Sequence, residues 1–126
     1  MGNYSEIVTE HFLNPRNAGA LDCPDAVGQA GAPGAGEFVV LQLKLAEGKI
    51  SQASFQTFGC GPAIAACSVL TEWLTGKSST QAQALSPEGL VEMLGGLPED
   101  KLFCAGLAIS ALREALAVIN PADHQE

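Results

Sequence analysis

The periodicity of the chain changes at the stretch Phe58-Gly59-Cys60-Gly61-Pro62-Ala63-Ile64-Ala65-Ala66-Cys67. Before it, apolar and polar residues alternate from Ile50 to Thr57, as in a half-buried strand. After it, apolar residues recur from Ile64 to Leu74 at helical spacing. The sequence therefore predicts a strand, a tight turn and a helix, with a cysteine at the turn.

Cys60 lies between two glycines at this predicted junction. Glycine permits a positive φ angle and lets a bulky ligand approach the backbone closely. The free amide groups and the dipole of the following helix favour a thiolate, the form that binds metals and attacks sulfur. The alternative is a small buried residue in a turn, because free cysteine is among the most buried residue types.

The rest of the chain predicts an α+β domain in which a small antiparallel sheet of about three strands is followed by helices. Strands are expected near Val27, at 38–45 and at 49–57, the last two joined by a tight turn at Glu47-Gly48. Helices are expected at 4–13, 62–75, 86–94 and from Pro98 onward. We expect Asn3 and Glu6 to form a weak capping box for the first helix. The core stripe expected for the last helix is Leu102, Leu107, Leu112, Leu116 and Ile119.

Composition narrows the class of protein. A length of 126 residues suits one domain, 1–126, and 47% hydrophobic residues suffice for one core without disulfides. The net charge of −8 leaves no basic stripe for nucleic acid. No secretory signal is recognised and no apolar run is expected to span a membrane, so we expect a cytoplasmic protein. Its four cysteines are then ligands or nucleophiles rather than disulfide partners.

Short motifs throughout the chain are shared with one protein family. They include Asn14-Pro15-Arg16-Asn17-Ala18-Gly19, Gly31-Ala32-Pro33, Phe58-Gly59-Cys60-Gly61 and Lys101-Leu102-Phe103-Cys104. Tyr4-Ser5-Glu6, Val27-Gly28 and the run from Thr71 to Lys77 match as well. In this order and spacing, the chain resembles the IscU/NifU family of iron–sulfur cluster assembly scaffolds over nearly its whole length.

This resemblance implies an IscU/SufE-like fold, with helices packed on one side of the sheet, and the function of a scaffold or carrier rather than an enzyme. Such a scaffold accepts persulfide sulfur from a cysteine desulfurase, forms a labile cluster, expected to be 2Fe–2S, and passes it to apo iron–sulfur proteins. The isolated protein is expected to hold zinc in some preparations. The oligomeric state expected is a monomer or a weak homo-oligomer.

The site that the resemblance implies consists of Glu37, where aspartate is usual, together with Cys60 and Cys104. Two family residues are missing. Ala35 stands where the family has its first cysteine, and Phe103 stands where it has a histidine. Ala35 fits either a naturally degenerate paralogue or an introduced substitution.

The resemblance also extends to a segment that docks a dedicated chaperone. The family reads Leu-Pro-Pro-Val-Lys there, and this chain reads Leu97-Pro98-Glu99-Asp100-Lys101. Docking of that chaperone is disfavoured, because a groove for an apolar peptide would have to desolvate two acids.

Other residues could replace the missing ligands. Cys67 follows Cys60 by two helical turns, and its apolar neighbours favour a core role. Cys23 lies in a loop between two aspartates. His11 and His124 are expected to be solvated rather than liganded. Alternatively, two chains could bridge one cluster with two thiolates each.

The resemblance implies that Cys104, the third cysteine of the family pattern, accepts the sulfur. Its place after Lys101, near a helix start, is expected to keep it exposed and to favour its thiolate. The alternative is an inert thiol packed under Leu107 and Ala108. Two other functions remain open, both without a cluster. One is a SufE-like sulfur acceptor, and the other is a regulator that binds the desulfurase and blocks it.

Overall fold

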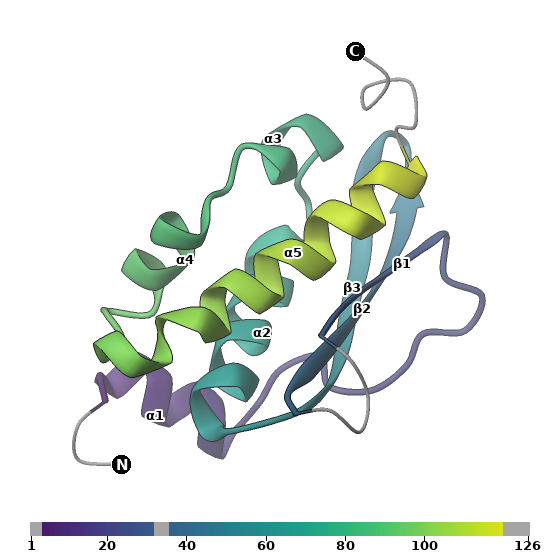
Figure 1. Ribbon diagram of the computed structural model, residues 1–126. Helices are drawn as coiled ribbons and strands as arrows, with labels where there is room; N and C mark the ends of the chain where they lie inside the picture. Colours follow the sequence, from purple (N-terminus) through teal and green to yellow (C-terminus); the bar gives the residue numbers. More distant parts are fainter. Residues whose placement is uncertain (1–3, 32–35, 120–126) are drawn as a thin grey trace.

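A computed structural model describes residues 4–31 and 36–119 of the chain (Figure 1). Within these residues the sheet has the order β1-β2-β3, from β1 (Ala26–Gly31), β2 (Phe38–Ala46) and β3 (Lys49–Phe58). The helices are α1 (Glu6–Leu13), α2 (Gly61–Leu74), α3 (Ser79–Gln83), α4 (Pro87–Met93) and α5 (Leu102–Ile119). A short 3₁₀ turn, η1 (Glu99–Lys101), leads into α5.

Both strand pairs are antiparallel, and the β2–β3 hairpin turns at Glu47-Gly48 as expected. These two residues have φ angles of 54° and 78°, which is the backbone of a type I′ turn. A bulge between Lys44 and Leu45 shifts the register of β3. Ile50 and Ala53 are both buried although they are three positions apart, because the bulge moves one residue out of the alternation.

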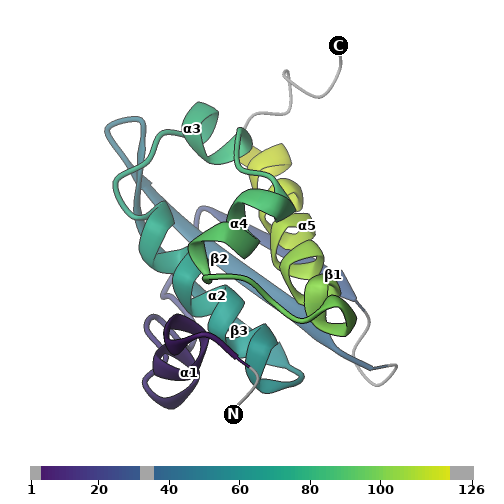
Figure 2. The same ribbon diagram turned by 90° about the vertical axis from the view of Figure 1, so that its left-hand side faces the viewer.

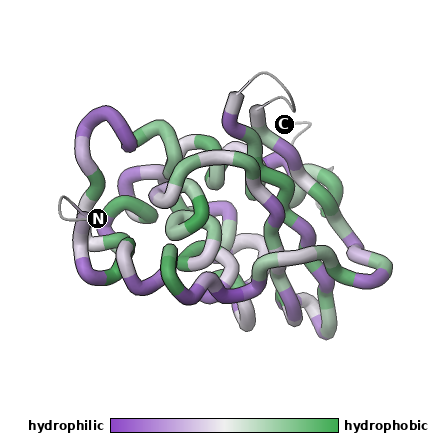
Figure 3. Tube along the Cα trace, turned by 90° about the horizontal axis from the view of Figure 1, so that it is seen from below, coloured by the Kyte–Doolittle hydropathy of each residue, from purple (hydrophilic) through white to green (hydrophobic). Residues whose placement is uncertain are grey.

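The helices cover one face of the sheet, which confirms the expected architecture (Figures 1 and 2). Helix α5 packs on β1 and β2, α2 packs on β3, and α1 packs on α2. The buried residues of β2 are Val39, Leu41 and Leu43. Hydrophilic and hydrophobic segments alternate along the strands in Figure 3, in keeping with a sheet that has one core face.

The buried face of α5 differs from the expected leucine stripe. Leu112 and Leu116 are fully buried, but Leu102 is 43% exposed, so the expectation for Leu102 was wrong. The helix instead turns its alanines inward, and Ala105, Ala108, Ala111 and Ala115 are all fully buried. Small side chains let the helix axis come close to the sheet. Leu102 and Leu107 are five residues apart, which is not a helical repeat, so they cannot share one narrow face.

Two helix starts also correct the sequence interpretation. Helix α1 is capped by Ser5, whose hydroxyl accepts a hydrogen bond from the Val8 N–H and donates one to the Leu94 carbonyl. The expected cap, Asn3, lies outside the described residues. Helix α3 was missed, although Ser78 and Gln81 form a complete capping box for it.

The segment Glu99–Ile119 is long and apolar enough to cross a membrane by length and composition alone. The expectation that no apolar run reaches that length was therefore wrong. Core helices pass the same test, and α5 lies along β1 and β2 with its alanine face buried. Packing in the core accounts for the apolar residues on its buried face.

Candidate functional site

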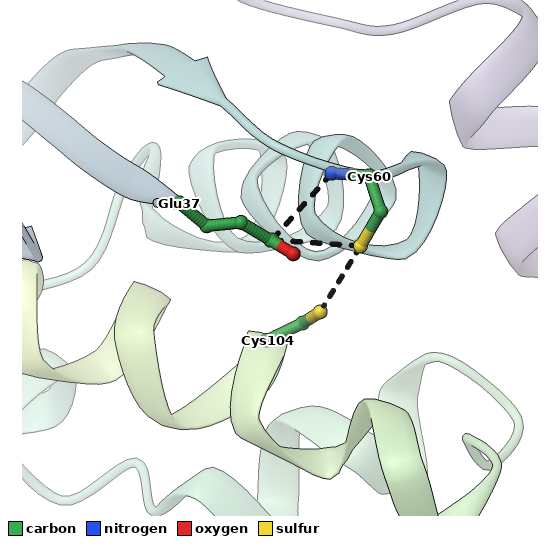
Figure 4. Close-up of side chains that lie close together, drawn as sticks. All are labelled: Glu37, Cys60 and Cys104. Atoms are coloured by element: carbon green, nitrogen blue, oxygen red, sulfur yellow. Dashed lines mark hydrogen bonds between the residues drawn. The ribbon is translucent and has the colours of Figure 1, made fainter. Parts of the chain in front are cut away.

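Three side chains from three separate parts of the chain meet at one end of the sheet (Figure 4). Glu37 directly precedes β2, Cys60 is the N-cap residue of α2, and Cys104 lies in the first turn of α5. One carboxylate oxygen and the two Sγ atoms all lie within 4.8 Å of one another. In the part of the chain that the structure describes, this is the group of acidic, histidine and cysteine side chains close enough to share a metal ion.

Cys60 is at the centre of the contacts. Its thiol and its backbone N–H both donate to Glu37 Oε1, each across 3.5 Å. Its Sγ lies 3.5 Å from Cys104 Sγ. The Glu37 carboxylate therefore sits at the N-terminus of α2, where the helix dipole favours a negative group.

Gly59 makes room for that carboxylate. A Cβ atom at this position would lie 2.6 Å from Glu37 Oε1, well inside van der Waals contact. Neither Gly59 nor Gly61 has a positive φ angle, so the expected conformational role of these glycines is not the one observed. Glycine matters at position 59 because the Glu37 carboxylate occupies the space that a side chain would need.

Cys104 is 1% exposed, which corrects the expectation of an accessible thiolate. Burial raises the pKa of the Cys104 thiol, and its hydrogen bond with Cys60 and the nearby Glu37 charge act in the same direction. Lys101 opposes this, but it does not outweigh them. The pKa of Lys101 is itself raised, with the charge of Cys60 as the largest cause and that of Cys104 as a smaller one.

The other cysteines stand apart from this group. Cys67 is 1% exposed, and burial raises its pKa to about 12, which confirms its core role. Cys23 is exposed and has a left-handed backbone with φ of 49°. Ala35, the position of the missing family cysteine, and His124 lie outside the described residues.

His11 is buried and partnered, so the expectation that it is solvated was wrong. Its Nδ1 lies 2.7 Å from Ser68 Oγ, and its Nε2 lies 3.8 Å from a Glu72 oxygen. Burial lowers the pKa of His11, and the Arg16 charge lowers it further. Ser68 also accepts a hydrogen bond from the Arg16 N–H, so this network fixes α1 and the Pro15-Arg16 segment against α2. The sequence signal for it was the polar Ser68 within the apolar stretch from Pro62 to Leu70 of α2.

Aromatic residues lie close to the three donors along the chain. Phe38 and Phe58 stack with ring centroids 6.3 Å apart and an interplanar angle of 14°. Phe58 is 67% exposed, and Phe103, next to Cys104, is 47% exposed. Two of the residues close to the donors in sequence are thus apolar and exposed.

A family model described as the NifU-like N-terminal domain matches residues 3–122. The chain belongs to this family. The three donor residues, Glu37, Cys60 and Cys104, all lie within the part of the chain that this family model matches.

Relatives agree with this assignment, and a solved structure shares the fold. The iron–sulfur cluster assembly scaffold protein IscU of Escherichia coli is 45% identical over 90% of this chain and 91% of its own length. A Drosophila melanogaster relative, named iron–sulfur cluster assembly enzyme IscU, is 48% identical over 90% of this chain and 76% of its own. The N-terminal part of a nitrogen-fixing NifU-like protein from Brucella abortus shares the fold, with a TM-score of 0.67 at 18% identity over 98% and 96% of the two chains.

Proposed function

We propose that this chain is an iron–sulfur cluster assembly scaffold that holds its cargo at Glu37, Cys60 and Cys104. The observation that supports this most directly is the meeting of three donor atoms within 4.8 Å from segments 23 and 44 residues apart. Thiolates are the ligands that hold iron–sulfur clusters. One carboxylate among them weakens the site, which suits a protein that must also release what it builds.

The site is incomplete as a four-ligand centre. Closed zinc sites use four protein ligands, and three donors leave one coordination position open. Water, a second chain or a residue introduced at position 35 would fill it. We propose that the cargo is a labile cluster of the 2Fe–2S type, and that zinc binds the isolated chain weakly.

Sulfur would come from a cysteine desulfurase, and the finished cluster would go to apo iron–sulfur proteins. The exposed aromatic residues Phe58 and Phe103 support docking of other proteins beside the donors. The chain is proposed as a carrier, with thiol exchange as its own chemistry.

Anaerobic reconstitution tests the proposal. The reduced chain is incubated with ferrous iron and inorganic sulfide, and bound iron, bound sulfide and visible absorption are measured after desalting. We expect a cluster in the unaltered chain and at least a tenfold loss of bound iron in Cys60→Ser and Glu37→Ala. Cys23→Ser is the matched control, because it removes an exposed thiol outside the group, and its iron content should be unchanged.

The same preparation separates the alternatives. If the unaltered chain takes no iron but becomes persulfidated with a desulfurase, it is a sulfur acceptor. If it only inhibits the desulfurase, it is a regulator. Equal iron content in the unaltered chain and in Cys60→Ser would remove Cys60 from the ligand set.

A further inference from the structure

The strand order β1-β2-β3 leaves one edge of β3 without a neighbouring strand. Two short segments cross parts of this edge. The Phe55 N–H donates to the Asn17 carbonyl, and the Phe55 carbonyl accepts from the Gly19 N–H. Nearer the start of the strand, Ile50 exchanges a similar pair of hydrogen bonds with Gly76-Lys77. Between these two contacts the edge of β3 is open.

Ala53 presents its backbone N–H and carbonyl to the open part of the edge. The backbone groups of successive strand residues point to alternate edges, and those of Phe55, two residues on, point away from β2. Ala53 pairs with Leu43, whose carbonyl accepts from the Asp25 N–H on the β1 side. The Ala53 groups therefore also face away from β2. Among the described residues, no hydrogen-bond partner is found for them.

A cavity of about 260 Å³ lies at this open part of the edge, lined by residues 17–21, residues 51–54 and Thr75. The Leu21 N–H donates to Gln42 Oε1 over 2.7 Å, and Gln42 pairs with Ser54, so the lining segment crosses the sheet face that carries Ser54. None of the lining residues carries a charge. Pockets for drug-sized ligands are about 300–1,000 Å³, so this cavity suits a smaller molecule that is neutral and polar.

Ser54 adds an unpaired hydrogen-bonding group to the lining. The residue is 5% exposed, and its Oγ is buried without a hydrogen-bond partner. A buried hydroxyl that is left unpaired is unfavourable. A hydroxyl both donates and accepts, so a ligand with a donor and an acceptor offers Ser54 the partner that the described residues do not provide.

We propose that this cavity binds a primary carboxamide. A primary amide carries an N–H and a carbonyl side by side, and an extended residue presents the same two groups along one edge. The ligand carbonyl accepts from the Ala53 N–H, and one ligand N–H donates to the Ala53 carbonyl. The second ligand N–H remains for the Ser54 hydroxyl.

Other small groups match this edge less well. A carboxylate has no donor for the Ala53 carbonyl, and a chain with a net charge of −8 does not favour an anion in an uncharged cavity. An ammonium or guanidinium group has donors only and leaves the Ala53 N–H unpaired. The carboxamide comes either from a free small amide or from an asparagine or glutamine side chain of another protein.

The cavity is separate from the three metal donors. A strand rises about 3.4 Å per residue, which places Ala53 about 17 Å along β3 from Phe58, and Cys60 lies beyond that end. The inference therefore goes beyond the proposed function and does not depend on it. Its tests use the full reduced chain without metal, so the result is independent of cluster binding.

NMR titration with isobutyramide tests the proposal. We expect saturable shifts of the Ala53 and Ser54 backbone amide signals, with a dissociation constant in the millimolar range. Isobutyrate has nearly the same shape but lacks the donor, and it should bind about fivefold more weakly or worse. The absence of saturable shifts would mean that the cavity holds water only. That result, or equal binding of isobutyrate, would overturn the proposal.

Amide hydrogen exchange examines the Ala53 hydrogen bond directly. In the free chain the Ala53 N–H should exchange faster than the Phe55 N–H, which is bonded to the Asn17 carbonyl. Isobutyramide at about ten times its dissociation constant should slow exchange at Ala53 about tenfold and leave Phe55 little changed. If Ala53 is as protected as Phe55 before ligand is added, its N–H already has a partner and the proposal fails.

Ser54→Ala removes the unpaired hydroxyl, so this variant should fold without loss of stability. Its affinity for isobutyramide should fall about threefold or more. Ser110→Ala is the matched control, because Ser110 is exposed on α5, and its affinity should be unchanged. Undiminished binding in Ser54→Ala would contradict the position proposed for the ligand.

A blocked glutamine distinguishes the two sources of the amide. N-acetylglutamine methylamide carries the same carboxamide on a peptide unit, and N-acetylalanine methylamide is its control. Tighter binding of the blocked glutamine than of isobutyramide, with no binding of the control, indicates a side chain of another protein. Binding of isobutyramide alone indicates a free small amide. Equal binding of the control and the blocked glutamine would mean that the cavity does not select a primary carboxamide, and would overturn the proposal.

Discussion

Gly28→Ala is expected to destabilise the chain strongly, because β1 touches the backbone of α5 at this residue. A Cβ atom at position 28 would lie 2.0 Å from the Ala111 carbonyl oxygen and 2.5 Å from the Ala115 amide nitrogen. These are backbone atoms in the middle of a helix, so no side-chain rotation relieves the clash. The helix must move away from the sheet by more than 1 Å to restore ordinary contact.

The cost can be estimated from overpacking in other cores. Extra methylene groups in a well-packed core cost about 1–3 kcal/mol, and more where the backbone has to shift. We expect about 3 kcal/mol or more here, against a total stability of about 5–15 kcal/mol for a domain. The displacement also moves the element that carries Cys104, so the distance between the two site sulfurs should increase.

Gly106→Ala is the matched control, since it makes the same substitution within α5. A Cβ at Gly106 meets nothing within 4 Å and requires no change of backbone. Alanine is favoured over glycine in a helix by about 1 kcal/mol, so this variant should be more stable than the unaltered chain. One added methyl group is therefore expected to have opposite effects at a packed position and at an open position of the β1–α5 pair.

Urea unfolding followed by circular dichroism measures both effects. With a slope of about 1–3 kcal/mol per molar urea, the midpoint should fall by about 1–3 M for Gly28→Ala and rise slightly for Gly106→Ala. An unchanged midpoint for Gly28→Ala would refute the close packing of α5 on β1. A fall for Gly106→Ala would show that this position is more crowded than the structure indicates.

Three further results are expected. Burial lowers the pKa of folded His11 below the ordinary 6.5, so the contribution of His11 to the free energy of unfolding is fully present above pH 6.5 and falls below it, as the unfolded chain takes up protons. In urea titrations at pH 7.5 and 5.5, His11→Asn should reduce the difference in stability between the two pH values. An unchanged difference would mean that His11 does not contribute. A small alkylating reagent should modify exposed Cys23 first and Cys60 next, while Cys67 and Cys104 react only on unfolding, as timed peptide mapping will show; early labelling of Cys104 would contradict its burial. Ala35→Cys should raise zinc content and cluster lifetime, measured by metal analysis and absorbance decay, and if both stay unchanged then position 35 does not supply the missing ligand.

Local patterns in the sequence determined the elements nearest the site. The β2–β3 hairpin follows from alternation on both sides of Glu47-Gly48, and α2 follows from the change of period after Cys60. Both depend on neighbours a few residues apart, so they are readable without the fold. Glu37, Cys60 and Cys104 were identified from family motifs. Such motifs give the place of a residue in the sequence, but not its burial or its partners in the fold.

The tertiary structure decided how these residues are placed and what surrounds them. Cys104 was expected to be exposed because it follows Lys101 near the start of a helix. It is buried because the first turn of α5 directs it toward Cys60, 44 residues earlier. His11 was read as solvated because its partner Ser68 is 57 residues away. Burial and pKa are set by which faces pack together, and such contacts between distant segments leave no periodic trace along the chain.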